Sequence, residues 1–214
     1  MYSLDMAHLI LVRHGKSEWN QLGKWTGLTD IGLVEEGIEE ARRAAEALKA
    51  VEIHSAYVSK LLRAQQTLDE MCKVLNIQLK TFTSAALNER DYGIYTGKNK
   101  WQIKDQIGDA EFMRLRRGWD VPIPQGESLK EVHARVVPYY LESILPEIIR
   151  GKNALVVSHG NTLRALAKHL EQISDEKVAE VEIGTGEAHV YSFDNRGRIQ
   201  DKQVLAANEN KAQV

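Results

Sequence analysis

Short apolar runs and longer helical repeats alternate along the chain. The runs are typical of strands buried in a sheet, and they occupy 9–12, 53–58, 77–82, 154–157 and 190–193. Between them, apolar residues recur at helical spacing, over 34–49, 61–75, 128–146 and 162–170. Strands that alternate with helices predict an α/β fold. We expect a three-layer sandwich, in which helices cover both faces of a mostly parallel central sheet.

Capping residues predict where several of these helices begin. Ser59 is placed to cap the second helix, and Ser128 begins a capping-box pattern at the start of the third. Val34 is a poor cap for the first helix, whereas Thr29 and Asp30 are good ones. The start of the first helix therefore stays open.

Prolines and a glycine turn predict further boundaries. Pro138 lies inside the third helix and is expected to bend it, and we expect that helix to end near Pro146. The tripeptide Asn195-Arg196-Gly197 predicts a turn that pairs the strand 190–193 with residues 198–204.

The alternation weakens over 87–125, where glycines, aromatics and basic residues mix. We expect two short helices there, around 101–107 and 111–117. This segment is interpreted as an insertion over the edge of the sheet, without a core of its own, where substrate lids occur. Since no linker or repeat interrupts the rest, residues 1–206 are predicted to form one catalytic domain, followed by a polar, frayed tail at 207–214.

Composition narrows the class of protein. Hydrophobic residues make up 43% and charged residues 27% of the chain, close to the averages for a globular protein. No apolar run approaches the roughly 20 residues of a membrane span, and a net charge of −2 argues against a nucleic-acid partner. The single cysteine, Cys72, and the lack of a signal peptide favour the cytoplasm.

Two histidine–glycine turns carry the candidate chemistry. Arg13-His14-Gly15 follows the strand 9–12, and Ser158-His159-Gly160 follows the strand 154–157. Ligands of open α/β sheets bind beyond the carboxyl ends of the strands. If these two strands are parallel neighbours, His14 and His159 lie side by side.

Positive groups accompany both turns. Arg13 precedes His14, Arg63 begins the second helix, and Asn161 lies where a helix N-terminus follows His159. Guanidinium groups and helix N-termini both bind anions. The sequence therefore predicts a site for a phosphate or another tetrahedral oxyanion.

Two other interpretations of the histidines stay open at this point. Either histidine by itself is compatible with a structural role in a loop. Two histidines also suit a metal ion, but no HxH or HxxxH spacing and no cysteine cluster supports one. We expect no metal.

At these residues the chain resembles a known family. The segment LVRHGKSEWN (11–20) resembles the opening motif of the histidine phosphatase superfamily. The segments ALNERDYG (86–93), GESL (126–129) and SHGNTLR (158–164) are similar to its cofactor-dependent phosphoglycerate mutase branch. The resemblance extends over nearly the whole chain.

The resemblance implies a reaction and a role for each matching residue. It implies interconversion of 3-phosphoglycerate and 2-phosphoglycerate in glycolysis and gluconeogenesis, primed by 2,3-bisphosphoglycerate and without a metal. His14 matches the nucleophile, Glu89 the proton donor and acceptor, and Arg13, Arg63 and His159 the phosphoryl pocket. The other positions matching substrate-binding residues are Ser17, Asn20, Thr26, Gly27, Tyr92, Lys100, Arg116, Arg117, Gly160 and Asn161.

Some of these assignments have alternatives. Arg116 and Arg117 also fit a solvated charged turn, and Lys98 lies close enough in sequence to replace Lys100. Tyr92 also fits an ordinary half-buried aromatic position.

The chain departs from the pattern of the family at three places. Leu28 stands where the family commonly has an aromatic residue, and Val34 stands where it has a serine or threonine cap. The direct connection from Pro124 to Gly126 replaces a longer segment of longer mutases. That shortening is expected to leave the site less covered, and it leaves a monomer and a homodimer equally open.

Two other functions compete with mutase activity. A phosphomonoesterase would use the same nucleophile with water as the acceptor. A non-catalytic module would only bind phosphorylated ligands. Replacement of His14 or Glu89 would favour this third function, but both residues are present. The expected partners are small phosphorylated three-carbon acids, and neither nucleic acid nor a membrane.

Overall fold

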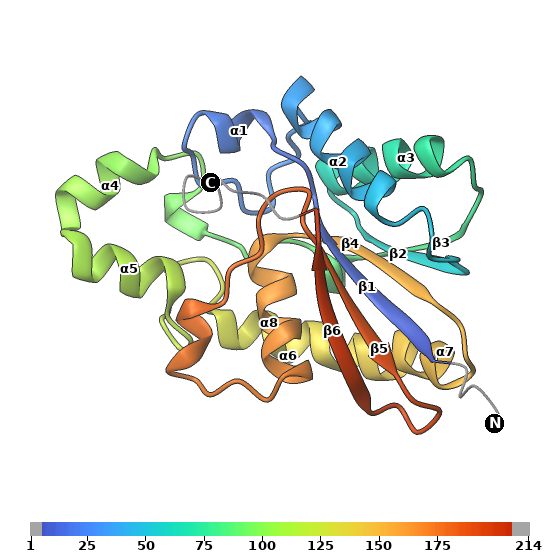
Figure 1. The fold of residues 1–214 in the computed structure, drawn as a ribbon. Helices are drawn as coiled ribbons and strands as arrows, with labels where there is room; N and C mark the ends of the chain where they lie inside the picture. Colours follow the sequence, from blue (N-terminus) through green and yellow to red (C-terminus); the bar gives the residue numbers. More distant parts are fainter. Residues whose placement is uncertain (1–5, 207–214) are drawn as a thin grey trace.

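A six-stranded sheet forms the centre of the molecule in the computed structural model, which describes residues 6–206 (Figure 1). The tail expected at 207–214 lies outside the described residues. The strands are β1 (Ala7–Arg13), β2 (Ser55–Ser59), β3 (Lys80–Ser84), β4 (Ala154–Ser158), β5 (Ala188–Phe193) and β6 (Ile199–Leu205).

The strand order is β3-β2-β4-β1-β5-β6. Parallel ladders join β3 to β2, β2 to β4 and β4 to β1, whereas β5 and β6 run antiparallel to their neighbours. The prediction of a mostly parallel sheet is confirmed. The predicted hairpin between β5 and β6 is confirmed as well, and its turn contains Gly197 with φ of 73°.

Helices cover both faces of this sheet, as the three-layer prediction requires (Figure 1). One layer contains α2 (Glu35–Ala47) and α3 (Leu62–Leu75). The other contains α6 (Leu129–Tyr139), the π-helix η3 (Tyr140–Ile144), α7 (Leu145–Ile149) and α8 (Gly160–Leu170). The remaining helical segments are α1 (Glu18–Gln21), α4 (Lys100–Ile107), α5 (Asp109–Arg117) and the 3₁₀ turns η1 (Ala85–Leu87), η2 (Gly93–Tyr95) and η4 (Lys177–Glu180).

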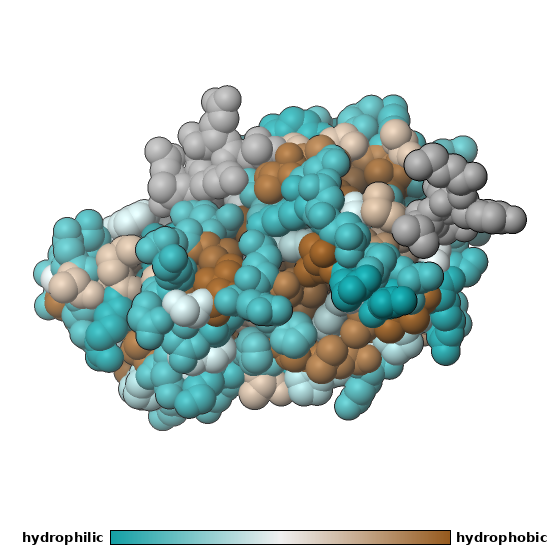
Figure 2. Space-filling model, turned by 60° about the horizontal axis from the view of Figure 1, so that its bottom comes forward, coloured by the Kyte–Doolittle hydropathy of each residue, from teal (hydrophilic) through white to brown (hydrophobic). Residues whose placement is uncertain are grey.

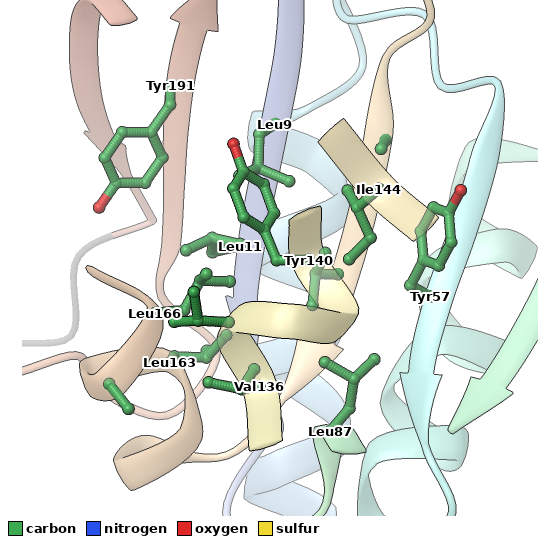
Figure 3. Packing of buried hydrophobic residues seen from close by; sticks show 14 of the residues in the cluster. Leu9, Leu11, Tyr57, Leu87, Val136, Tyr140, Ile144, Leu163, Leu166 and Tyr191 are labelled. Carbon is green, nitrogen blue, oxygen red and sulfur yellow. The ribbon is translucent and has the colours of Figure 1, made fainter. Parts of the chain in front are cut away.

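Strand β1 shows how the two layers are held to the sheet. Side chains alternate across a strand, so Leu9 and Leu11 belong to the core under α6 and α8 (Figure 3), whereas Ile10 and Val12 belong to the core under α2 and α3. All four side chains are fully buried. Each stabilises the fold by about 1.5–3 kcal/mol relative to an exposed side chain.

Two predicted boundaries are wrong. Ser59 does not cap α3: its hydroxyl accepts from the Leu61 N–H before the helix begins, and Leu61 is the N-cap without a side-chain bond. The third helix does not end near Pro146, which lies in the first turn of α7, where its ring is tolerated. Pro138 lies inside α6, as predicted, and the chain continues from Tyr139 into η3. The bend expected at Pro138 stays a prediction.

The segment 87–125 forms the predicted short helices α4 and α5, but the expectation that it lacks a core is wrong. Tyr92, Phe112, Leu115 and Ile123 pack with Trp25 into a separate apolar cluster. The ring centroids of Trp25 and Tyr92 lie 4.4 Å apart. This segment therefore packs around its own apolar cluster, separate from the two cores on the faces of the sheet, and lies beside one end of the sheet.

Polar residues predominate on the face shown in Figure 2, where apolar residues appear in separate patches. Within residues 6–206, none of the helices has the length and apolar character needed to cross a bilayer.

Candidate active site

The turn after β1 is held by backbone and side-chain contacts on several sides. The His14 N–H donates to the Ser158 carbonyl at 2.9 Å, and the Gly15 N–H donates to the Thr67 hydroxyl at 3.1 Å. The Lys16 N–H donates to the Glu40 carboxylate at 2.7 Å. Three consecutive amides are therefore bonded to β4, α3 and α2, which places the His14 side chain on a rigid support.

The two predicted histidines lie side by side. Arg13 pairs with Ser158 in the parallel ladder of β1 and β4, so the next residues, His14 and His159, leave the same edge of the sheet. Their ring centroids are 4.9 Å apart. This confirms the adjacency that the two strand-ending motifs predicted.

The hydrogen bond of His14 identifies its tautomer. Nδ1 lies 2.7 Å from the Gly15 carbonyl oxygen. Because a carbonyl can only accept, Nδ1 carries the proton and Nε2 carries the lone pair. Burial, followed by the charges of Arg63 and Arg13, holds the pKa of His14 well below its usual value. The imidazole is therefore neutral at pH 7, as a nucleophile must be.

His159 is oriented by a chain of hydrogen bonds. The Ser59 hydroxyl donates to Asn88 Oδ1 at 3.0 Å, so its oxygen accepts from His159 Nε2 at 2.8 Å. Nδ1 then faces away from Ser59, and it is buried without a hydrogen-bond partner among residues 6–206. Burial is the largest cause that lowers the pKa of His159, followed by Arg63 and His14.

Arg13 and Arg63 are buried beside the histidines and anchored by carbonyl groups. Arg13 Nη1 donates to the Ile183 carbonyl at 2.8 Å. Arg63 donates from Nη1 to the Thr29 carbonyl and from Nη2 to the Gly27 carbonyl, both at 2.9 Å. Burial lowers the pKa of Arg63 to about 10, so its guanidinium remains charged at neutral pH. Both guanidiniums are fixed in place before any anion binds.

Glu89 is held at the N-terminus of α8. Its Oε1 accepts from the Arg90 N–H at 2.8 Å, the Asn161 N–H at 3.3 Å and Asn161 Nδ2 at 3.2 Å. Asn161 Nδ2 also donates to the Tyr92 hydroxyl at 2.7 Å, and Arg164 Nη2 donates to Asn161 Oδ1 at 2.8 Å. These bonds occupy Oε1 and leave Oε2 of Glu89 as the oxygen that can exchange a proton with a ligand.

Basic residues from the segment 87–125 complete the outer half of the pocket. Lys100, Arg116 and Arg117 all line it. Lys98 is exposed, with its Nζ over the Tyr95 ring, so the structure favours Lys100 over Lys98. Burial, aided by the charges of Arg116 and Arg13, lowers the pKa of Lys100 to about 7. An anion bound nearby would restore its full charge.

Most of the predicted site residues share this pocket. Two of them do not line it. Ser17 is buried as the N-cap of α1, where its hydroxyl donates to Asn20 Oδ1 at 2.9 Å, and His159 is fully buried beside His14. The predicted residues that line the pocket are Arg13, His14, Asn20, Thr26, Gly27, Arg63, Glu89, Tyr92, Lys100, Arg116, Arg117, Gly160 and Asn161.

Sequence reasoning missed several other lining residues. Lys24 and Trp25 precede the predicted Thr26, and Arg164 ends the SHGNTLR motif, so proximity to the motifs was a usable signal. Residues 181–183 carried no signal, because they lie in an irregular connection between η4 and β5.

Among residues 6–206, three residues that line the pocket contain a buried nitrogen without a hydrogen-bond partner, and so does His159 beside His14. Arg13 Nε, Trp25 Nε1, Arg164 Nε and His159 Nδ1 have no hydrogen-bond partner within the part of the chain that the structure describes. Leaving such groups unpaired costs about 1–3 kcal/mol each.

The described residues contain no group of three or more histidine, cysteine, aspartate or glutamate side chains placed to hold a metal ion. The positive charge of the pocket comes from arginine and lysine side chains and from the N-terminus of α8.

Two adjacent imidazoles and several fixed guanidiniums, at the carboxyl ends of parallel strands, define an α/β protein that binds and transfers phosphoryl groups. Residues 9–204 match the family model of the histidine phosphatase superfamily, branch 1. The chain belongs to this superfamily.

Curated relatives resemble the chain over nearly its full length. It is 42% identical to the 2,3-bisphosphoglycerate-dependent phosphoglycerate mutase of Parvibaculum lavamentivorans, covering 94% of this chain and 97% of the relative. It is 44% identical to the protein of the same name from Methylorubrum populi, covering 92% of this chain and 94% of the relative.

Solved structures share the fold. A mycobacterial glucosyl-3-phosphoglycerate phosphatase in complex with VO3 superimposes with a TM-score of 0.79. The match covers 94% of this chain and 100% of the other, at 24% identity. This likeness supports the architecture of the sheet and its two helical layers.

Proposed function

We propose that this chain is a phosphoglycerate mutase that interconverts 3-phosphoglycerate and 2-phosphoglycerate, with 2,3-bisphosphoglycerate as the priming phosphoryl donor. The names of its relatives at 42–44% identity support this activity. The observation that carries it is the coexistence in one pocket of the His14 nucleophile with Lys100, Arg116 and Arg117. The first holds a phosphoryl group, and the other three hold a second anionic group.

His14 divides the transfer into two displacements. The Nε2 lone pair attacks phosphorus while the bond to the donor oxygen breaks, and the second substrate oxygen later attacks the phosphohistidine. Phosphoryl transfer requires mainly in-line positioning and stabilisation of charge on the three other oxygens. Arg13, Arg63 and the N-terminus of α8 supply that stabilisation from fixed positions. His159 Nδ1 is the adjacent group that can share the proton of the phosphoryl group.

Glu89 supplies the proton chemistry. A leaving alkoxide requires a proton, and the attacking hydroxyl must lose one in the reverse step. Oε2 is the available carboxyl oxygen, because Arg90 and Asn161 donate to Oε1. The same carboxyl group therefore gives the proton in one displacement and takes it back in the other.

Retention of the ligand distinguishes a mutase from a phosphatase. After the first displacement the bound product must reorient or exchange without water reaching the phosphohistidine. Lys100, Arg116 and Arg117 provide the attraction that keeps a carboxylate or second phosphate in the pocket. The substrates are therefore small phosphorylated acids with two anionic groups.

We also infer that the reaction needs no metal ion, because guanidinium and ammonium groups supply the positive charge around the phosphoryl group. Activity is expected to be unchanged after treatment with EDTA, and strong inhibition reversed by manganese would contradict this. A role in glycolysis and gluconeogenesis, in the cytoplasm, follows from the proposed substrates.

A coupled assay tests the proposed function. Purified enzyme is supplied with 3-phosphoglycerate, and formation of 2-phosphoglycerate is followed through enolase, with and without 2,3-bisphosphoglycerate. We expect turnover that depends on the bisphosphate, together with an acid-labile phosphoenzyme that His14→Ala abolishes. Release of inorganic phosphate at a rate equal to or above isomerisation would identify a phosphatase instead. Binding of phosphoglycerate without either reaction would identify a non-catalytic module.

A further inference from the structure

One carboxylate in the pocket has no role in the proposed reaction. Among the lining side chains of residues 6–206, cations outnumber carboxylates, and the two carboxylates are Glu89 and Glu182. Glu89 has the proton-transfer role. Glu182 places a negative charge in a pocket whose ligand is anionic, which lowers affinity unless the charge is moved away. The lining cations are Arg13, Lys24, Arg63, Lys100, Arg116, Arg117 and Arg164.

Glu182 is paired with a residue of the outer half of the pocket. Its Oε1 lies 2.7 Å from Arg117 Nη2, and Arg117 Nη1 donates to the Val181 carbonyl at 3.3 Å. The side chain of Arg117 is 14% exposed and that of Glu182 is 28% exposed. The Arg117 side chain is therefore more enclosed than the Glu182 side chain, which keeps contact with solvent.

The charge of Glu182 acts on more than Arg117. It opposes the effect of burial on the pKa of Arg13 and of Arg116. Glu182 thus faces three of the guanidiniums around the pocket. It lies in the connection between η4 and β5, so the motifs of the site do not include it.

We propose that Glu182 is an internal counter-ion, which a ligand with two anionic groups displaces from Arg117 when it binds. The ligand class rests on the proposed function. The guanidinium edge that Glu182 occupies is one of the edges that a carboxylate or phosphate uses for paired N–H···O bonds. Binding of the second anionic group therefore exchanges one ion pair for another.

This exchange has two consequences. Affinity for the doubly anionic ligand is lower than the cations alone would give, so bound products leave more readily. A phosphomonoester without a second anionic group occupies the His14 end and leaves the Arg117–Glu182 pair intact. Glu182 therefore affects the two ligand classes unequally, and it determines how strongly the site discriminates between them.

The test measures ligand binding by calorimetry in wild type, Glu182→Gln and a matched control, Glu180→Gln. Glu180 is exposed, lies two residues away and does not line the pocket. The two ligands are 2,3-bisphosphoglycerate and glycerol 3-phosphate. We expect Glu182→Gln to lower the Kd of the bisphosphate about five-fold, the effect of removing one partly screened like charge. Glycerol 3-phosphate should change less than about two-fold, and Glu180→Gln should change neither.

The direction of the change in the Kd of the bisphosphate distinguishes a counter-ion role of Glu182 from a purely structural role. If Glu182 only holds Arg117 in position, Glu182→Gln and Glu182→Ala will both bind the bisphosphate more weakly than wild type, and the proposal is overturned. Unchanged binding in both variants overturns it too. Tighter binding in a protein that fails the coupled assay would leave the counter-ion role standing and remove the mutase function.

Discussion

Gly15→Ala tests whether the rigid turn beside the nucleophile is required. A Cβ built on Gly15 would lie 2.0 Å from the carbonyl oxygen of Gly37, the third residue of α2. The reverse contact is equally close, since a Cβ on Gly37 would lie 2.1 Å from the Lys16 carbonyl oxygen. The turn and α2 therefore contact each other through backbone atoms at Gly15 and at Gly37. No flexible side chain lies between them that could move to make room for a Cβ.

The size of the effect follows from this distance. Real Cβ atoms essentially never approach closer than 3.0 Å, so the turn and α2 must separate by about an ångström. Overpacking of this kind costs about 1–3 kcal/mol, and loss of the Lys16–Glu40 and Gly15–Thr67 hydrogen bonds adds about 1 kcal/mol each. We expect the free energy of unfolding to fall by about 3–5 kcal/mol, which lowers Tm by about 6–20 °C in a chain of this size.

Activity should fall beyond what the loss of stability explains. A displacement of the nucleophile by about an ångström costs about a hundred-fold in rate. The assay is turnover of 3-phosphoglycerate well below the Tm of the variant, where the protein is folded by circular dichroism. Gly32→Ala is the control, because its Cβ would meet only the side-chain end of Gln66, at 3.2 Å. A Gly15→Ala protein with the turnover and Tm of wild type would refute the reasoning.

Four further predictions concern other parts of the molecule. Glu89→Gln should reduce turnover by about 10²–10⁴-fold with little change in ligand affinity, as expected for a general acid–base group; weakened binding with normal turnover would contradict its role. Val34→Thr should raise the free energy of unfolding by about 1 kcal/mol in urea titrations. Val34 is the N-cap of α2 and has the extended backbone of a cap, but its side chain cannot form the capping hydrogen bond. An unchanged urea midpoint would argue against a missing cap. Binding of bisphosphoglycerate at pH 7.5 should take up as much as about three-quarters of a proton at Lys100, because its pKa of about 7 rises beside an anion. Calorimetry in two buffers measures this uptake, and Lys100→Met should remove it. The free energy of unfolding should fall as the pH drops below about 6.5, because His14 and His159 are protonated there in the unfolded chain but, with their lowered pKa values, stay neutral in the folded protein. His14→Gln should make the slope of this free energy against pH shallower by as much as about 1.4 kcal/mol per pH unit. An identical slope would show that His14 does not contribute.

The adjacency of His14 and His159 could be predicted from the sequence although 145 positions separate them. Each follows a short apolar strand, and parallel neighbouring strands end at the same edge of a sheet. Arg13 and Gly160 belong to the same two motifs. The helices on both faces followed from the spacing of apolar residues, because burial of one face imposes that spacing locally.

The predicted helix cap at Ser59 is wrong because its hydroxyl has other partners. Ser59 has the residue type of a cap, but its hydroxyl is used by Leu61, Asn88 and His159. Contacts with Asn88 and His159, which lie far from Ser59 in the sequence, therefore determine the use of this hydroxyl.

The sequence by itself determined which residues form strands and helices and which motifs bear the phosphoryl chemistry, because periodicity and motif residues act over short stretches of chain. Only the tertiary structure decided that Lys100 instead of Lys98 faces the pocket, that Trp25 joins the small core of the segment 87–125, and that Glu182 pairs with Arg117. Each of these depends on how segments far apart in the chain pack together, and no local pattern of residue types encodes that packing.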